Sequence, residues 1–214
     1  MKVVAVNIGE KQTVSWRGKP VQTGIYKYPV DYPIILGKTD VEGDVVYDRK
    51  YHGGIDKACY LYSEDHYDYW KEKFPDLDWS HGMFGENITV EGLNEAELQI
   101  GDILYIGECR VQVSQPRQPC FKLGIRFETQ KVLKEFINAP YPGVYVKVIQ
   151  EGAVQKGDHV QLSERLHDSI GLLEVWNLLY NNNPDQDLLE FAAHFQHLGK
   201  GAKDTLLKKL NLIG

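Results

Sequence analysis

The sequence predicts a mainly β domain over residues 1–162, followed by a small three-helix segment over residues 163–214. Two observations support this division. Up to about residue 160, short β-branched or alternating segments lie between Gly, Pro and Asp turns, a pattern typical of a β-barrel or sandwich. After about residue 163, paired leucines and aromatic residues recur at helical spacing instead.

The strands of the first domain are expected in short runs rich in Val, Ile, Thr and Tyr. Two similar turns, 99–102 and 155–158, end in Gly-Asp and each enters a strand, which fits a barrel with rough internal symmetry. The predicted strands are 3–6, 32–36, 87–90, 103–106, 110–113 and 143–149.

Two helices interrupt the predicted strands. The first begins at Ser63, a good N-cap residue, and ends before Pro75, and we expect its aromatic face to lie in the core. The second covers residues 129–138, where Val132, Leu133, Phe136 and Ile137 share one face before Pro140.

The apolar pattern of the C-terminal segment predicts three short helices, separated by breaks at 181–184 and 197–201. A unit of about 45 residues buries little apolar surface, so we expect it to pack on the barrel or on a partner. A DNA-binding helix-turn-helix is the alternative. Residues 163–214 hold five Lys and Arg against seven Asp and Glu, and no basic recognition face is present to support that alternative.

The net charge, the apolar runs and the cysteine count exclude several classes of protein. The formal net charge of −6 gives no global electrostatic attraction to nucleic acid or an anionic membrane. No apolar run approaches the roughly 18 residues of a membrane span, and the start of the chain does not read as a signal peptide, so we expect a cytoplasmic protein. Three cysteines without a CxxC pair indicate reduced thiols rather than a disulfide framework or zinc site.

Cys120 is the first candidate for chemistry. It follows Pro116 and Pro119, which should make residues 114–119 a stiff loop rather than central sheet. A short helix after Pro119 would place Cys120 at a helix start between Arg117 and Lys122, where the thiolate is favoured. A thiolate can bind a soft metal or attack an electrophile. Cys59 and Cys109 instead lie in apolar patterns and should be buried.

Two glycine-containing segments are candidate binding loops. In the first, Arg49, His52 and Lys57 flank Gly53 and Gly54, a combination suited to a phosphate or a polar heterocycle. The second, 81–89, contains His81, Gly85, Glu86 and Asn87, whose side chains can read hydrogen-bond donor and acceptor edges. A simple turn is the alternative for the first loop, and a loop-capping role is the alternative for His81.

Taken together, these motifs resemble the MOSC-domain family, which is named after the C-terminal domain of molybdenum-cofactor sulfurase. The resemblance rests on DRKYHGGIDK at 48–57, GMFGENIT at 82–89, Gly-Asp at 101–102 and QPRQPC at 115–120. The tail resembles the extra three-helix segment of the bacterial YiiM proteins. A cysteine-desulfurase domain, present in the sulfurases, is absent from this sequence.

The resemblance implies a MOSC-type β-barrel that binds a molybdenum–pterin cofactor, with Cys120 as the protein ligand to molybdenum. It places Arg117 beside the cofactor, and Arg49 and Asp56 either at the cofactor or bracing the loop. Pyridoxal phosphate binding is a further term used for the family. The other implied cofactor residues are His52, Gly53, Gly54 and Lys57 at the pterin or phosphate, and Gly85, Glu86 and Asn87 at the hydrogen-bonding edge of the pterin.

The implied activity is reduction of small N-hydroxylated compounds, such as hydroxylaminopurine-type bases, from N–OH to N–H, with His81 or Glu86 as the proton source. The chain has no dinucleotide-binding glycine motif or iron–sulfur cysteine cluster, so a separate reductase must supply electrons, and the helical tail is a candidate docking surface. Two alternatives stay open: a cofactor or sulfur carrier without turnover, and a Cys–His hydrolase using Cys120 with His52 or His81. A homodimer is considered, and the sequence does not fix the oligomeric state.

Overall fold

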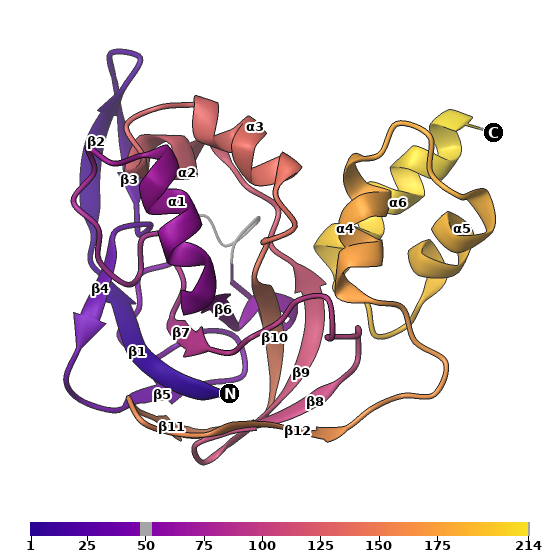
Figure 1. The fold of residues 1–214 in the computed structure, drawn as a ribbon, viewed down its shortest axis with the longest axis horizontal. Helices are drawn as coiled ribbons and strands as arrows, with labels where there is room; N and C mark the ends of the chain where they lie inside the picture. The colour runs from indigo at the N-terminus through magenta and orange to yellow at the C-terminus, as the bar shows by residue number, and fades with distance from the viewer. Residues whose placement is uncertain (48–52, 214) are drawn as a thin grey trace.

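The computed structural model describes residues 1–47 and 53–213, and its centre is an eight-stranded mixed sheet (Figure 1). The strand order is β12-β8-β9-β10-β6-β7-β1-β4, and every neighbouring pair is antiparallel except β6 and β7. The strands are β1 (Lys2–Gly9), β4 (Lys27–Val30), β6 (Cys59–Ser63), β7 (Ile88–Glu91), β8 (Ile103–Ile106), β9 (Cys109–Pro116), β10 (Val144–Gln150) and β12 (Val160–Glu164).

The sheet curls until its two ends almost meet. A single bridge joins Lys2 of β1 to His159, just before β12, and Val160 N donates to the carbonyl of Met1 at 3.0 Å. The fold is therefore the mainly β domain that the sequence predicts, built as a strongly curved sheet rather than a fully closed barrel.

Two small antiparallel pairs flank the main sheet. One joins β5 (Ile34–Leu36) to β11 (Gly152–Val154), and the other is a hairpin of β2 (Gln12–Trp16) and β3 (Lys19–Thr23). The sequence pattern missed β2, β3, β4, β6, β11 and β12, because most of these strands are short or carry polar residues that lack a clear alternation.

The helices lie close to the positions that the sequence predicts. A 3-10 turn, η2 (Glu64–His66), leads into α1 (Tyr67–Lys73), and α3 (Lys131–Asn138) is the second predicted helix. The short helix after Pro119 is α2 (Phe121–Arg126). The tail forms α4 (Leu172–Tyr180), α5 (Gln186–His194) and α6 (Lys200–Ile213), and a further 3-10 turn, η1 (Ile55–Lys57), precedes β6.

Two hydrophobic clusters hold these elements together. An aromatic cluster under α1, α2 and α3 contains Trp70, Phe84 and Phe136, which confirms that the aromatic face of the first helix is core. The larger cluster fills the curled sheet and continues without a break into α4, α5 and α6 through residues such as Leu172 and Leu206. The helical tail therefore packs on the sheet, as expected.

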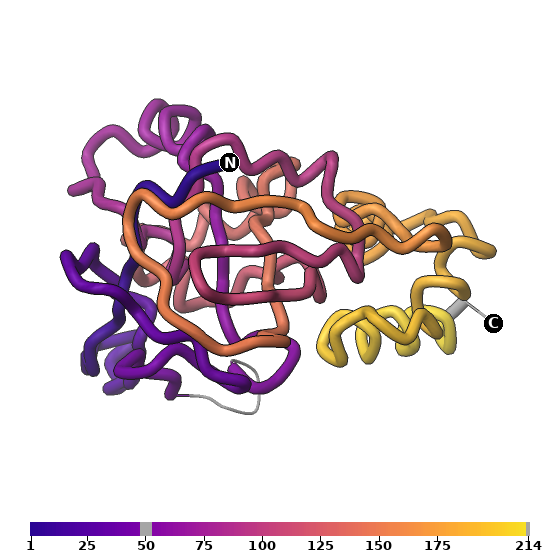
Figure 2. Tube along the Cα trace, turned by 90° about the horizontal axis from the view of Figure 1, so that it is seen from below, coloured from indigo at the N-terminus to yellow at the C-terminus, as the bar shows by residue number. Residues whose placement is uncertain are grey.

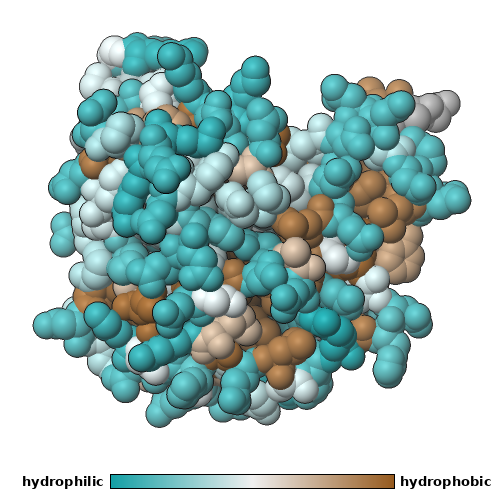
Figure 3. All heavy atoms as spheres, in the orientation of Figure 1, coloured by the Kyte–Doolittle hydropathy of each residue, from teal (hydrophilic) through white to brown (hydrophobic). Residues whose placement is uncertain are grey.

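The chain passes from β12 to α4 as an extended stretch along the sheet (Figure 2). β12 runs to Glu164, so the expected division after residue 162 falls inside this strand. Apolar atoms gather over the C-terminal helices on the face that Figure 3 shows. None of the helices in the described ranges combines the length and the apolar character needed to cross a membrane.

The segment before Cys120 differs from the prediction. Ser114, Gln115 and Pro116 belong to β9, a central strand, and Pro116 pairs with Val144 of β10. A proline is tolerated at position 116 because the pairing of β8 with β9 ends at Gln112. On the side of β9 that faces β8, no backbone N–H is therefore needed from residue 116. The stiff loop is shorter than predicted and begins after Pro116.

Candidate functional site

A pocket with an empty volume of about 660 Å³ opens between the end of β9, the loop before β6 and the segments around β3 and β4. We call it the Cys120 pocket. Its lining residues are Thr23, Gly24, Ile25, Lys27, Asp44, Val45, Val46, Tyr47, Gly53, Lys57, Ala58, Tyr60, Phe84, Gly85, Asn87, Arg117, Cys120, Lys122 and Tyr145.

Cys120 lies on the pocket wall and is only partly buried. It is the N-cap residue of α2, the position that the sequence predicts. Cys59 and Cys109 are buried in the core, and burial raises the pKa of Cys109 to about 11. Cys120 is thus the one cysteine of the three that lines this pocket.

Arg117 is buried beside the thiol, with 5% of its surface exposed. Its guanidinium carbon lies 5.5 Å from the centre of the Tyr60 ring and 5.3 Å from that of Phe136. Burial by itself lowers the pKa of Arg117, but Tyr60, Tyr145 and Cys120 outweigh that effect and raise the pKa above its ordinary value. Nη1 is buried and has no hydrogen-bond partner among residues 1–47 and 53–213. Such an orphaned cationic donor is suited to an anionic or acceptor group in the pocket.

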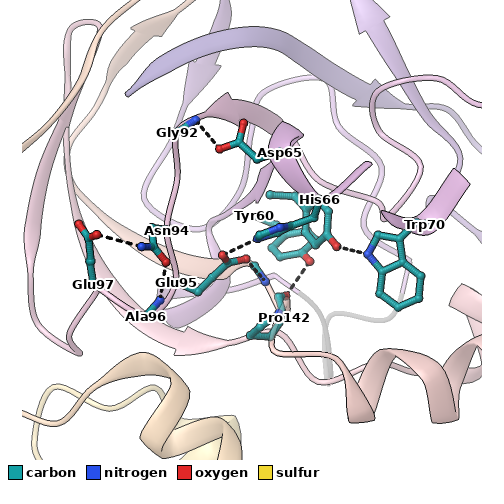
Figure 4. A network of polar contacts seen from close by, with 12 residues as sticks. Tyr60, Asp65, His66, Trp70, Gly92, Asn94, Glu95, Ala96, Glu97 and Pro142 are labelled. Atoms are coloured by element: carbon teal, nitrogen blue, oxygen red, sulfur yellow. Dashed lines mark hydrogen bonds and ion pairs between the residues drawn. The ribbon is translucent and has the colours of Figure 1, made fainter. Parts of the chain in front are cut away.

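Tyr60, one of the two aromatic residues beside Arg117, belongs to a hydrogen-bond network that Figure 4 shows. The Tyr60 hydroxyl donates to the carbonyl of Pro142 at 2.8 Å. Next to it, the buried Glu95 contacts His66 Nε2 at 2.8 Å and accepts from Gly143 N at 3.1 Å. These bonds tie η2 and the start of β10 together, so the Tyr60 ring has little freedom to move.

The first predicted binding loop contributes two residues to the pocket, Gly53 and Lys57. Gly53 has φ +75, and a Cβ there would lie 3.2 Å from Val46 Cγ1. Burial lowers the pKa of Lys57, while the charges of Asp56 and Cys120 oppose this shift.

The other residues of that loop lie elsewhere. Gly54 is not part of the lining and begins η1. Asp56 accepts from Lys200 N at 2.7 Å and pairs with Lys147 at 3.2 Å, which ties the loop to the start of α6. Arg49 and His52 lie outside the described residues.

The second predicted loop divides in the same way. Gly85 and Asn87 line the pocket, whereas Glu86 and His81 do not. Glu86 is fully buried and accepts hydrogen bonds from the Tyr67 hydroxyl and from Gly82 N, Phe84 N and Thr89 Oγ1. His81 pairs with Glu64 at 3.0 Å. Neither side chain is among the pocket residues, so the role of Glu86 or His81 as proton source stays a prediction that the lining of the pocket does not support.

Of the four cations near Cys120 in the sequence, two line the pocket and two lie elsewhere. Arg117 and Lys122 line the pocket. Arg110 instead forms an ion pair with Glu164 of β12, and Arg126 lies over the rings of Tyr26 and Tyr28.

Sequence reasoning missed a buried ion pair in the pocket lining, between Lys27 and Asp44, whose side chains are 8% and 3% exposed. Asp44 also accepts from Gly9 N at 2.8 Å and from Asn87 Nδ2 at 3.0 Å. No local pattern signals the pair, because its members lie on separate segments that only the folded sheet brings together.

Comparison with known proteins agrees with the fold and the motifs. A family model described as the MOSC domain matches residues 48–161. YflK of Bacillus subtilis is 35% identical over 207 residues, 97% of this chain and 93% of that protein. YiiM of Escherichia coli is 37% identical over 198 residues, 90% of this chain and 85% of that protein.

A protein named Reductase from Gibberella moniliformis is 34% identical over 175 residues, which are 80% of this chain and 31% of that longer protein. The crystal structure of YiiM from Geobacillus stearothermophilus superposes with a TM-score of 0.81 at 31% identity, covering 98% of both chains.

Proposed function

This chain belongs to the MOSC-domain family, and on that premise we propose that it is a molybdenum-cofactor-dependent oxidoreductase that reduces small N-hydroxylated compounds, hydroxylaminopurine-type bases among them. The reaction converts R–NHOH, two electrons and two protons into R–NH₂ and water. The observation that carries the proposal is the side chain of Cys120 on the wall of a pocket that also holds an unpartnered arginine donor. The name of the fungal relative supports oxidation–reduction chemistry.

The residues of the pocket fit a bulky, anionic molybdenum–pterin group. A thiolate is a soft ligand, suited to a metal that also binds sulfur, and Cys120 would be the protein ligand. The described part of the chain has no group of three or more His, Cys, Asp or Glu side chains that could hold a metal ion, so the pterin would supply further ligands. Arg117, Lys57 and Lys122 bring positive charge to the same pocket.

When bound, the cofactor would supply the two-electron chemistry. The protein's own contribution is positioning and hydrogen bonding. Arg117 Nη1 would donate to an acceptor atom of the bound group, and the rings of Tyr60 and Phe136 hold the guanidinium in place. Lys57 Nζ takes the role of proton source, because Lys57 lines the pocket whereas Glu86 does not.

The enzyme is proposed to act in the cytoplasm and to receive its electrons from a separate protein. The proposal of a separate electron donor rests on the sequence, in which we find neither a dinucleotide-binding glycine motif nor an iron–sulfur cysteine cluster.

The test compares Cys120→Ala with Cys109→Ala, both purified from a host that makes the cofactor. Molybdenum content and reduction of hydroxylaminopurine by an artificial donor, reduced methyl viologen, are measured for folded protein. We expect Cys120→Ala to lose both while its circular dichroism is unchanged, and Cys109→Ala to keep both per folded molecule. Full activity and normal molybdenum content in Cys120→Ala would refute the proposal. Molybdenum without turnover in the wild type would favour the carrier alternative.

A further inference from the structure

We propose that the surface around the β2–β3 hairpin and the start of α2 is the docking site for an acidic electron-transfer protein. We call it the hairpin face and define it by Lys11, Trp16, Arg17, Tyr28, Phe121 and Arg126. The inference rests on the proposed reductase function, because a reductase without an electron carrier of its own needs a partner. It places that partner away from the helical tail.

The hairpin face begins at the mouth of the Cys120 pocket. Phe121 follows Cys120 directly in the chain, is 40% exposed, and its ring centre lies 6.2 Å from that of Trp16 on the hairpin. Lys11 lies over the ring of Tyr47, a pocket residue, at 5.6 Å. The hairpin and α2 lie together, on the opposite side of the molecule from α4, α5 and α6 (Figure 1). A partner bound here would sit next to the candidate metal ligand.

The charge of this surface differs from that of the whole protein. The net charge is −6, yet the face carries two exposed cations, Lys11 and Arg17, and a half-buried one, Arg126, and the half-buried Lys122 follows Phe121 in the chain. None of the four forms an ion pair with any other residue among 1–47 and 53–213.

The acidic residues next to these cations in sequence are Glu10 and Glu128. Of the two exposed cations, only Lys11 has an acidic residue within two positions in the sequence. An acidic partner would be attracted over several ångströms and oriented by this field.

Arg17 gives an independent observation. It and Gly18 form the two-residue turn of the hairpin, with φ values of +50 and +74. Such turns favour Asn, Asp or Gly, and an arginine there keeps its backbone in a disfavoured region. Its exposed guanidinium lies over the Trp16 ring at 5.4 Å. An arginine in a place where the turn prefers another residue indicates that the side chain itself is needed.

The composition of the face is that of a protein interface. Arginine and aromatic residues are enriched at interface centres, and here Arg126 lies between Tyr26 and Tyr28, of which Tyr28 is 42% exposed. Each turnover would oxidise the docked donor by two electrons in total. These electrons, with two protons, cleave N–OH to give N–H and water.

The first experiment measures binding of the full chain to flavodoxin, a small acidic flavoprotein, at low and at physiological salt. The test variant carries Lys11→Glu and Arg17→Glu together. The control variant carries Lys156→Glu and Lys208→Glu, which change the net charge by the same amount at exposed positions away from the face. Because Lys208 lies on α6, the control also tests docking on the tail.

We expect association at low salt to slow by about tenfold for the first pair only. Equal effects of the two pairs, a loss confined to the control pair, or no binding of flavodoxin by the wild type would overturn the proposal.

The second experiment separates a binding role of Arg17 from a structural one. Arg17→Asn should raise Tm, because the turn favours asparagine, and should weaken flavodoxin binding, whereas Arg17→Lys should keep the binding. A variant that loses stability and binding together would contradict this.

Reduction by methyl viologen should be unchanged in every variant. If the wild type reduces hydroxylaminopurine with neither donor, the proposed function fails. Full flavodoxin-driven reduction in the Lys11→Glu, Arg17→Glu variant refutes only the docking site.

Discussion

Asp44 should be one of the most sensitive residues of the protein to substitution, and more sensitive than its ion-pair partner Lys27. Removing one member of a buried ion pair costs about 3–5 kcal/mol, because the other charge stays buried without a partner. Asp44→Ala also removes the acceptor of Gly9 N and of the Asn87 amide, at about 1–3 kcal/mol for each stranded donor. We therefore expect Asp44→Ala to lower the free energy of unfolding by at least about 5 kcal/mol.

Lys27→Met should cost less, about 3 kcal/mol, since Asp44 keeps its two other donors. A domain of ordinary stability unfolds with about 5–15 kcal/mol, so Lys27→Met should stay folded while Asp44→Ala comes close to unfolding. The combined variant Lys27→Met with Asp44→Asn should cost less than the sum of its single changes, because neither charge is left alone.

Urea unfolding followed by tryptophan fluorescence measures these differences, with the slope of the transition as a check that the unfolded state is unchanged. The reasoning is wrong if Asp44→Ala costs no more than Lys27→Met. It is also wrong if the double variant costs the full sum, since the two charges would then be independent.

Three further changes test other parts of the structure. Glu86→Gln should lower the free energy of unfolding by about 2 kcal/mol, because the new amide leaves a donor such as Phe84 N without its acceptor, while turnover per folded molecule is unaffected; a normal Tm with lost turnover would instead support a catalytic role. Gly199→Ala should cost about 1–3 kcal/mol in chemical unfolding, since its Cβ would lie 2.4 Å from Oε1 of the buried Gln115, and a neutral result would show that this side chain can move. Stability should fall as pH rises from about 9 toward 11, because the raised pKa of Cys109 keeps its thiol neutral in the folded state while the unfolded chain ionises; Cys109 alone contributes a slope of about 1.4 kcal/mol per pH unit, the raised pKa values of the buried Cys59 and Tyr60 add to it in the same direction, and a flat profile would contradict it.

The sequence determined the elements whose signal is local. Helices such as α1 and α3 are recognisable because their apolar faces lie within one stretch of chain, and the long β-branched strands β1 and β10 are recognisable for the same reason. Cys120 is likewise found from its neighbours, since two prolines and a following helix fix its setting. Strand β4 carries a lysine and a proline in four residues, and its place at the sheet edge is decided by pairing with β1.

Only the tertiary structure decided which polar residues meet. The family resemblance implies that Lys57, Gly85 and Asn87 share one cofactor site with Cys120, and all three line its pocket. The same resemblance puts Glu86 there too, but in the folded turn its buried carboxylate accepts from Gly82 N and Phe84 N, and Glu86 does not line the pocket. The Lys27–Asp44 pair has no local signature at all, because strand register and the packing of distant turns, rather than neighbouring residues, bring the two charges together.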